Sequence, residues 1–478
     1  MKIAKNRWVW FVFVTSITVL LGIVVYVHTT KALPDGLSYK GDIHYVEDVD
    51  FLYDLSYVDS TEQPQHELRI FKRINEMILE AEEFVVIDLF LFNSYYDTKS
   101  DFPPISGELT NSILTAMEKK PDLKVFFITD PINHAYGSHH SEELELLEDY
   151  GVEVIYTDLV KLRDSNPIYS SIWRTAFQWF QFYEKGDGWL PNPMSKDAPD
   201  ITFGSYLEML NIKANHRKIV ATDQSAMISS ANPHDESGYH SNIAFEVEGS
   251  IISDVIESEQ AVATFSEGID LPAVEKSKET DGPIAIRLVT EGKIQKQLIE
   301  ELDAAETGDE VFIGIFYLAD RDVLEAIMRA ADKEIPVHIV MDSNQNAFGQ
   351  EKTGLPNIPV SKELHDYSDL IDIRWYNTDI EQYHTKMTYI KKDAESVIIG
   401  GSANYTGRNL NDFNLESDLW IQAPNDSEVI KEVQDYFDRI LSNEDAKYTL
   451  TYEEKKQSLP VFKYMVYRLQ KFFYFTTY

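Results

Sequence analysis

The sequence contains two copies of one pattern of apolar segments, and this repetition limits the folds that are open to it. EEFVVIDLFLFN at 82–93 resembles DEVFIGIFYLAD at 309–320, and LKVFFITDPINHAYG at 123–137 resembles IPVHIVMDSNQNAFG at 335–349. Amphipathic stretches such as RIFKRINEMILEA lie between the apolar ones. Apolar strands that alternate with helices predict a mixed or parallel sheet covered on both faces. The repetition predicts two such α/β domains that face each other.

Each copy also carries a polar motif on a segment that otherwise reads as a β-strand. The motif residues are His216, Lys218, Ser230 and Asn232 in the first copy, and His384, Lys386, Ser402 and Asn404 in the second. Side chains two positions apart on a strand point to the same face, so each His and Lys would project together. A hairpin would return the Ser and the Asn to the same place. Two copies at corresponding places of a repeat predict one shared site.

The chemistry of this residue set suits a phosphodiester. Two ammonium groups can neutralise the phosphoryl oxygens, and we expect Ser230, Asn232, Ser402 and Asn404 to bind the same phosphate. One imidazole can attack phosphorus while the other protonates the departing oxygen. Because the lysines supply the positive charge, we expect neither a metal ion nor a cofactor.

The motif His-x-Lys-x4-Asp followed by Ser-x-Asn resembles the signature of the phospholipase D superfamily, over about residues 68–441. The resemblance implies an α/β fold in which two tandem phospholipase D-like domains form one active site, and a reaction through a phosphohistidine. It implies that His216 is the nucleophile and His384 the general acid and later the base, with the reverse assignment also open.

The first motif is complete with Asp223, and the second departs from it. Lys391 stands where the motif acid is expected, and Asp393 follows two residues later in a lengthened turn. In the family this acid supports the fold more than it touches substrate. We count Asp223 in the catalytic set because it completes the first motif. Because the family acid mainly supports the fold, we expect Asp393 to matter little.

The resemblance also implies that an acid orients a motif histidine. Glu416 in NLESDLW matches this acid and joins His216, Lys218, Asp223, His384 and Lys386 in the predicted catalytic set. The corresponding stretch NIAFEVEG puts Ala244 at that place, with Glu246 nearby. The orienting acid of the first copy is thus not identified from the sequence.

Residues 8–27, WVWFVFVTSITVLLGIVVYV, are apolar enough to cross a membrane. At ~1.5 Å per residue such a helix spans ~30 Å, the thickness of a bilayer core. Lys2, Lys5 and Arg7 precede it and mostly acidic residues follow, so we expect a single-pass anchor in the cell membrane with an extracytoplasmic catalytic domain. The alternative is a signal peptide that is cleaved near 30–32.

The expected organisation has four parts and one insertion. The parts are a cytoplasmic N-terminus and anchor at 1–30, a first domain at 40–270, a second domain at 285–445 after a linker at about 275–286, and a tail at 446–478. The tail is basic, aromatic and amphipathic, which is typical of a helix in a lipid interface or of one packed on the protein's own core. The insertion at about 159–210 is rich in aromatic residues, and can be a lid, a membrane-docking element or a local hydrophobic cap.

The net charge of −37 disfavours nucleic acid as a partner, because phosphate backbones are bound by basic surfaces. The lack of cysteine excludes disulfides, thiolate metal sites and cysteine nucleophiles. We therefore expect a phospholipid substrate, a membrane as partner, and a phospholipase D or cardiolipin synthase-like activity. The alternatives are a nuclease of the same superfamily, or a catalytically degenerate protein that binds lipid headgroups.

Two weaker groups of residues remain. His139, His140, Glu142 and Glu143 could ligate a metal, but a solvated loop that enters a helix explains them as well. His234 and His240 are expected at the rim of the site, near Asn232.

Overall fold

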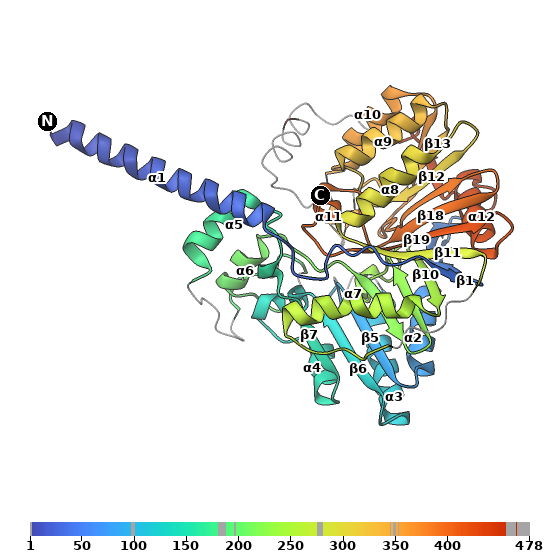
Figure 1. Cartoon of the computed structure of the whole chain (residues 1–478), viewed down its shortest axis with the longest axis horizontal. Helices are drawn as coiled ribbons and strands as arrows, with labels where there is room; N and C mark the ends of the chain where they lie inside the picture. Colours follow the sequence, from blue (N-terminus) through green and yellow to red (C-terminus); the bar gives the residue numbers. More distant parts are fainter. Residues whose placement is uncertain are drawn as a thin grey trace.

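A computed structural model gives the structure, which describes residues 2–96, 101–179, 188–195, 197–274, 281–344, 346–347, 350–351, 353–455 and 465. A long helix, α1 (Lys2–Thr30), projects from an α/β body that is built on two large sheets (Figure 1). Residues 7–30 of this helix are long and apolar enough to cross a membrane. The expected class, an α/β protein with an N-terminal candidate membrane helix, is confirmed.

The first sheet has seven strands in the order β2-β10-β9-β8-β5-β6-β7. The strands are β2 (Asp50–Tyr53), β5 (Phe84–Leu89), β6 (Lys124–Thr129), β7 (Glu153–Tyr156), β8 (Lys218–Thr222), β9 (Ser225–Ser229) and β10 (Ile243–Glu248). Helices α2 (Ile70–Glu80), α3 (Ile105–Lys119) and α4 (Glu142–Asp149) contribute apolar side chains to a core with β5 and β6. In α2 the buried residues recur every three or four positions, which gives the helix one apolar face.

The second sheet has nine strands in the order β1-β11-β19-β18-β17-β12-β13-β16-β20. The strands are β1 (His44–Val46), β11 (Ile284–Thr290), β12 (Glu310–Ile315), β13 (Val337–Met341), β16 (Ile371–Tyr376), β17 (Lys386–Lys391), β18 (Glu395–Gly401), β19 (Ser417–Pro424) and β20 (Thr449–Thr451). Helices α8 (Gly292–Ala304), α9 (Arg321–Asp332) and α10 (Asn357–Tyr367) pack on it through a second core. The run β19-β18-β17-β12-β13-β16 has the same order as β10-β9-β8-β5-β6-β7 of the first sheet.

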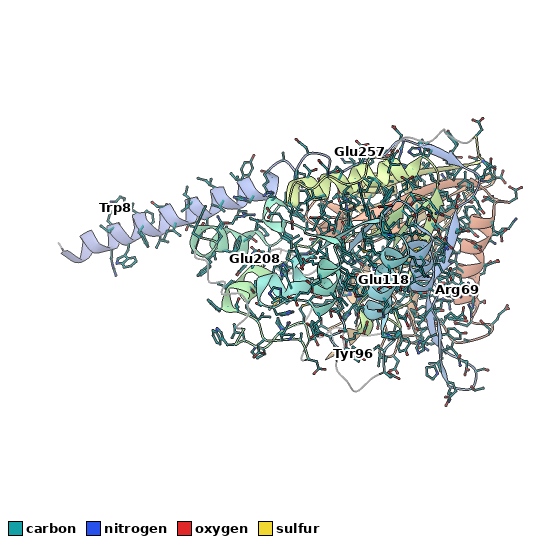
Figure 2. The ribbon with its side chains drawn as sticks, turned by 90° about the horizontal axis from the view of Figure 1, so that it is seen from below. Trp8, Arg69, Tyr96, Glu118, Glu208 and Glu257 are labelled. Atoms are coloured by element: carbon teal, nitrogen blue, oxygen red, sulfur yellow. The ribbon has the colours of Figure 1, made fainter. Side chains whose placement is uncertain are left out.

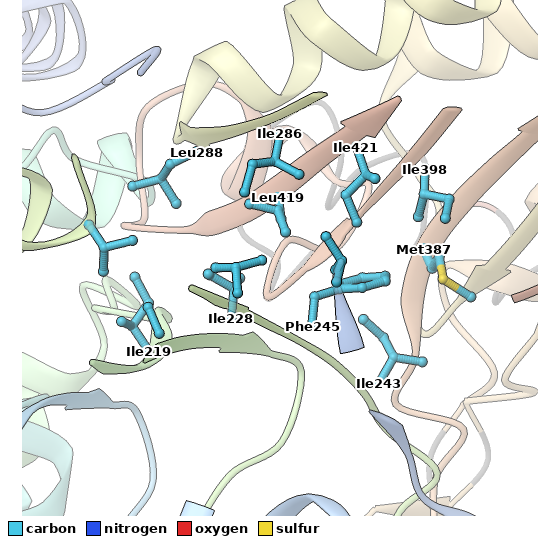
Figure 3. Packing of buried hydrophobic residues seen from close by; sticks show 14 of the residues in the cluster. Ile219, Ile228, Ile243, Phe245, Ile286, Leu288, Met387, Ile398, Leu419 and Ile421 are labelled. Carbon is cyan, nitrogen blue, oxygen red and sulfur yellow. The ribbon is translucent and has the colours of Figure 1, made fainter. Parts of the chain in front are cut away.

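A third core lies between the two sheets. Ile228 and Phe245 of the first sheet pack with Ile286 and Leu419 of the second, together with apolar side chains of α7 (Ile251–Ser266) and α12 (Glu428–Ser442) (Figure 3). Each fully buried side chain of this size contributes about 1.5–3 kcal/mol. The two motif strands, β8 and β17, are therefore held by one continuous apolar contact.

Two short strands differ from the domain boundaries that we expected. β1 falls within residues 40–270 but pairs with β11 in the second sheet, through His44 and Ile286. β20 falls within 446–478 and pairs with β16. Each pairing joins segments that are far apart in the sequence, so no local sequence pattern predicts it. Linker residues 275–280 and tail residues 456–478, apart from Met465, lie outside the described residues.

The insertion packs against the base of α1. Its described α-helices are α5 (Pro167–Ile172) and α6 (Phe203–Met209), and α5 lies beside that end of α1 (Figure 1). Backbone N–H of Asp164 donates to the carbonyl oxygen of His28 at 2.9 Å, and Arg163 Nε donates to that of Lys31 at 2.8 Å. Seen from below, α1 extends from the side of the body that carries Glu208 of α6 (Figure 2). The insertion therefore lies where the candidate membrane span enters the body.

Candidate active site

The two motif strands meet at one place between the sheets. His216 and His384 each stand two residues before the lysine that opens β8 or β17. Backbone N–H of His216 donates to the carbonyl oxygen of Leu415 at 2.9 Å, and that of His384 donates to Ser241 at 2.8 Å. Each motif histidine is thus tied to the opposite half of the chain, and the residues of both halves line one site.

His216 is paired with a buried carboxyl group. Its Nδ1 lies 2.9 Å from Glu416 Oε2, and Glu416 is fully buried. Ser402 Oγ accepts from the Ser417 N–H at 2.9 Å, so its own hydrogen is donated to Glu416 Oε2 at 2.5 Å. Asn409 Nδ2 donates to the other carboxyl oxygen. The carboxylate form satisfies all of these donors, and His216 Nδ1 supplies a further hydrogen.

His384 is paired with an amide instead. Its Nδ1 lies 3.0 Å from Asn242 Oδ1. Ser230 Oγ accepts from the Ile243 N–H at 3.0 Å and donates to Asn242 Oδ1 at 3.1 Å, while Asn242 Nδ2 donates to the carbonyl oxygen of His240 at 3.0 Å. Asn242 Oδ1 is therefore an acceptor, and His384 Nδ1 carries the hydrogen. In both histidines Nε2 is left as the reactive nitrogen.

This pairing corrects the register that we expected for the first copy. Backbone N–H of Ser230 donates to Ile243, as that of Ser402 donates to Ser417, so Asn242 and not Ala244 is equivalent to Glu416. Ala244 is a core residue of the first sheet. The nearby acid is also elsewhere, because Glu246 accepts two hydrogen bonds from the Arg73 guanidinium, at 2.7 and 2.9 Å.

The two lysines are buried and close to their histidines. Lys218 Nζ donates to the carbonyl oxygen of His216 at 2.7 Å, and Lys386 Nζ donates to that of His384 at 2.6 Å. Burial lowers the pKa of Lys218 to about 7. Burial, followed by the charge of Lys218, lowers the pKa of Lys386 well below its usual value. Two ammonium groups held this way favour an anionic ligand, which would offset both effects.

The imidazoles are neutral before substrate binds. Burial first, then Lys218 and Lys386, lowers the pKa of His216 well below its usual range. Burial and Lys386, with a smaller effect of His240, do the same to the pKa of His384. Burial raises the pKa of Glu416 to about 8, while Lys218 and the donors around the carboxyl act in the opposite direction.

Residues 298–441 match the family model described as cardiolipin synthase, PLD-like domain. Among solved structures, the phosphatidylserine synthase of Haemophilus influenzae Rd KW20 matches with a TM-score of 0.55 at 13% sequence identity, over 91% of this chain and 94% of that one. The second half of the chain therefore contains a phospholipase D-like domain, and the chain as a whole shares the fold of this phosphatidylserine synthase. A polyphosphate kinase from Porphyromonas gingivalis matches over 88% of this chain and 52% of that one, at 12% identity and a TM-score of 0.44. A search of curated proteins gives no significant match.

The four residues expected to bind phosphate divide into two kinds. The hydroxyl groups of Ser230 and Ser402 are used to hold the partners of the motif histidines, so their direct binding of phosphate is not supported. Asn232 and Asn404 are 6% and 5% exposed, and the Oδ1 of each accepts no hydrogen bond from the described residues. The two amides stay our candidates for the phosphate.

Asp223 lies outside the site, which corrects its place in the predicted catalytic set. Its Oδ1 accepts from the backbone N–H groups of Glu82 and Glu83, at 2.9 and 3.0 Å, at the far end of β8. Its role is to hold the turn before β5. Asp393 lies in the exposed turn between β17 and β18, where its carbonyl oxygen accepts from Asn425 Nδ2 at 3.0 Å.

Two matched pairs of residues support the site and were missed. Asp130 Oδ2 accepts from the N–H of Asn215, and Asp342 Oδ2 accepts from that of Tyr383, each at 2.8 Å, so both acids fix the entry to a motif strand. The alignment of the two sequence copies places these two acids at the same position, and this match is the sequence signal that could have identified them. The second pair is aromatic.

The ring of Phe90 lies 5.0 Å from that of His216, and the ring of Phe316 lies 5.1 Å from that of His384. Each phenyl ring also lies near the Nζ of the adjacent motif lysine. The two rings shield the imidazoles and lysines from water on one side.

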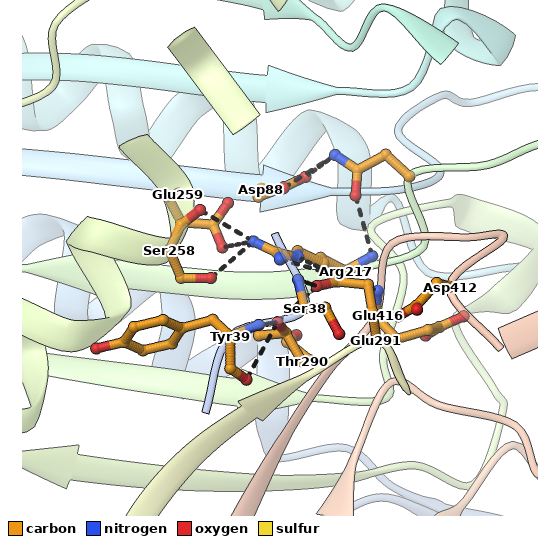
Figure 4. A network of polar contacts seen from close by, with 12 residues as sticks. Ser38, Tyr39, Asp88, Arg217, Ser258, Glu259, Thr290, Glu291, Asp412 and Glu416 are labelled. Carbon is orange, nitrogen blue, oxygen red and sulfur yellow. Dashed lines mark hydrogen bonds and ion pairs between the residues drawn. The ribbon is translucent and has the colours of Figure 1, made fainter. Parts of the chain in front are cut away.

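Arg217 lies between His216 and Lys218, just before β8, and its side chain points away from theirs. It is fully buried, and it binds Glu259 of α7 at 2.9 Å and Glu291 at 2.7 Å (Figure 4). Glu291 Oε1 also accepts from the backbone N–H of Glu416 at 3.2 Å. Arg217 therefore connects the first motif strand to the residue that holds His216.

The same network reaches the chain that follows α1. Glu291 Oε2 accepts from the backbone N–H of Ser38 at 2.7 Å (Figure 4). On the other side, Asn215 Nδ2 donates to both oxygens of Asp88, at 2.8 and 2.9 Å. Burial, and then the charge of Glu259, raises the pKa of Asp88 well above its usual range. This environment favours the neutral form of Asp88.

The weaker histidine groups are placed as follows. In the described residues no group of three or more His, Asp or Glu side chains is arranged to hold a metal ion, and His140 Nδ1 lies 3.0 Å from Glu145 Oε1. The His240 ring lies 5.8 Å from that of His384, at the site. His234 bonds through Nε2 to the carbonyl oxygen of Tyr95 at 3.1 Å.

Proposed function

We propose that the protein is a membrane-anchored phosphodiesterase or phosphatidyltransferase that acts on phospholipids through a phosphohistidine intermediate. The observation that carries the proposal is the unequal pairing of the two imidazoles, one with the Glu416 carboxyl at 2.9 Å and the other with the Asn242 amide at 3.0 Å. An enzyme that makes a covalent bond at one histidine and moves a proton at the other needs two different environments.

In the first step, the phosphodiester binds between Lys218 and Lys386. His216 donates its Nδ1 hydrogen to Glu416, so the Nε2 lone pair attacks phosphorus and the bond to the leaving oxygen breaks. The product is a phosphoimidazolium, whose positive charge is stabilised by the carboxylate 2.9 Å away. His384, protonated once the anionic substrate offsets the lysine charges, gives its Nε2 proton to the departing alcohol.

In the second step, neutral His384 takes the proton from water or an acceptor alcohol. The oxygen of that molecule attacks phosphorus, and the bond to His216 Nε2 breaks. Water gives hydrolysis, and an alcohol gives phosphatidyl transfer. The amide partner suits His384 for this work, because a neutral acceptor holds the ring without raising its pKa as a carboxylate would.

The first test asks whether turnover needs both motif histidines. We expect His216→Asn, His384→Asn and Lys218→Met each to lower turnover of phosphatidylglycerol vesicles by about 10³-fold or more, and Asp393→Asn to leave it unchanged. Products are separated by thin-layer chromatography, with and without an added alcohol. Near-wild-type turnover by either histidine variant would exclude the two-histidine mechanism.

The second test uses a p-nitrophenyl phosphodiester, whose leaving group needs no proton. His384→Asn should still form an acid-labile, base-stable phosphorylated protein, and His216→Asn should not. The reverse result would exchange the two roles. The alternatives lead to other outcomes, since a nuclease would turn over nucleic acid in preference to lipid, and a degenerate headgroup-binding protein would bind vesicles without turnover.

A further inference from the structure

A hollow, open on one side, lies under the insertion of the first half. Its apolar lining comes from three segments of the chain. The main apolar residues are Leu91, Ile132, Ala135, Met194, Ile201 and Met209. A largely apolar lining is typical of pockets that bind small molecules.

One wall of this hollow is formed by residues next to Phe90, which contacts the candidate active site. Leu91 directly follows Phe90, whose ring lies 5.0 Å from that of His216. Asn133, on the same wall, donates through Nδ2 to the carbonyl oxygen of Phe90 at 2.8 Å. A ligand whose phosphate lay at the motif histidines would therefore have the hollow next to it.

Polar side chains along the hollow are bonded within the protein. Asn133 Oδ1 accepts from the backbone N–H of Phe92 at 2.9 Å. Asn192 donates to the carbonyl oxygen of Pro199 at 3.2 Å and accepts from the N–H of Met194 at 3.0 Å. With these groups engaged, the lining suits an apolar ligand.

The roof of the hollow belongs to the insertion at the base of α1. Leu190 and Ile201 pair through their backbones across this roof. The outer surface of the insertion exposes large apolar side chains, and α1, whose residues 7–30 are long and apolar enough to span a membrane, ends beside α5. These exposed side chains are Ile168, Ile172, Trp179, Trp189, Met194 and Phe203. Met194 belongs both to this surface and to the hollow, so the two are continuous.

We propose that this hollow binds one acyl chain of the phospholipid substrate, with the insertion as its roof. The inference rests on the proposed function for the identity of the substrate. The chain would pass from the bilayer at the base of α1, under the insertion, to a position where its phosphate reaches the motif histidines. The insertion then has a substrate-binding role in addition to its contact with the anchor.

The test is photocrosslinking on the full chain in vesicles of phosphatidylcholine and phosphatidylglycerol. The probe is a phosphatidylglycerol with a diazirine near the end of one acyl chain, and labelled peptides are mapped by mass spectrometry. We expect label within residues 132–139, and also on α1, where contact with bulk lipid provides an internal standard.

Ala198 lines the hollow, and Ala198→Phe should fill it. If the filled hollow excludes even two methylene groups of the acyl chain, the affinity for that chain falls about tenfold. Label at 132–139 should therefore fall about tenfold relative to label on α1. Ala394→Phe, in the exposed turn between β17 and β18, is the matched control and should change nothing. Ala198→Leu should give an intermediate loss. Unchanged far-UV circular dichroism and an unchanged denaturant midpoint would show that the filled variants are folded.

Label confined to α1 and the outer insertion, or equal label at 132–139 in wild type and Ala198→Phe, would overturn the proposal. Crosslinking does not depend on turnover. If the label follows the expected pattern while no phosphodiester is converted, the acyl-chain site stands and the proposed function fails.

Discussion

His216 and His384 differ in the group that accepts their Nδ1 hydrogen, and this difference sets what each can do. A carboxylate stabilises a cationic ring, which is what a phosphorylated histidine becomes. An amide stabilises it less, and leaves His384 a stronger acid. Because the serines behind Glu416 and Asn242 are placed alike, one pair of residues accounts for the contrast.

Asn242→Asp should therefore shift the pH dependence of the reaction. A carboxylate at this place favours protonated His384 and raises its pKa, by about one unit or more. Activity that needs the protonated acid is lost as pH rises through that pKa, so the alkaline limb of kcat/KM moves to higher pH. The measurement uses a soluble short-chain phospholipid. Glu416→Gln is the control, and should move the acid limb to lower pH while it lowers the rate. An unchanged alkaline limb in Asn242→Asp would contradict the assignment.

Asp223→Ala should cost stability and not chemistry. Two backbone N–H groups lose their acceptor, which corresponds to about 1–3 kcal/mol in the free energy of unfolding. Specific activity of the folded protein should stay within about twofold, because the turn lies at the far end of β8. Denaturant titration followed by tryptophan fluorescence gives the first quantity. Asp393→Ala is the matched control in the other half and should change neither; a large loss of specific activity in Asp223→Ala would return this residue to the catalytic set.

Among the elements, β8 and α7 are joined by a buried charge network that also holds the start of α8. The Arg217 guanidinium and the carboxyl groups of Glu259 and Glu291 are all fully buried. Removing one partner of such a network leaves the others unpaired, which costs more than an exposed ion pair. The motif strand is therefore held on both faces. The candidate site holds one face, and the ion pairs of Arg217 hold the other.

Arg217→Met should lower the free energy of unfolding by about 3–5 kcal/mol, because two carboxyl groups lose their counter-charge. Arg321→Met on α9, whose side chain is about half exposed, is the matched control and should cost less than about 1 kcal/mol. Both are measured by denaturant titration of the full chain in detergent. Equal losses in the two variants would show that the network does not stabilise the fold.

The positions of the buried strands and their repetition were the part most accessible from the sequence, and the register of β10 was the part least accessible. Apolar segments such as 82–93 have a period and length that indicate buried strands. The stretch NIAFEVEG offers several registers, and only pairing with β9 shows that Asn242 faces His384. The fold of the insertion was equally hidden, since its aromatic composition does not say that α1 is the surface it packs against.

For the molecule as a whole, the distribution of charge around α1 determines on which side of a membrane the site lies. Lys2, Lys5 and Arg7 precede the span, and basic residues near a span stay in the cytoplasm. We predict an extracytoplasmic catalytic body. Protease added to intact protoplasts should digest it, while a cytoplasmic marker protein stays intact. Full protection of the body, with digestion only after lysis, would reverse the topology.

The same orientation predicts how the site meets its substrate. Trp179 and Trp189 are 73% and 68% exposed on the insertion beside α1, and aromatic side chains at such places favour the membrane interface. If they seat the site against the bilayer, Trp179→Lys with Trp189→Lys should lower activity on vesicles about tenfold, since the loss of ~1.4 kcal/mol of interfacial binding corresponds to that factor.

Activity on a dibutyryl phospholipid below its micelle concentration should stay unchanged in the same variant, because this substrate reaches the site from water. Tyr150→Lys with Tyr367→Lys is the matched control, since both tyrosines are exposed, Tyr150 directly after α4 and Tyr367 at the end of α10. Equal losses on vesicles and on the soluble substrate would indicate damage to the site itself. Unchanged activity on vesicles would show that α1 alone brings the site to the lipid.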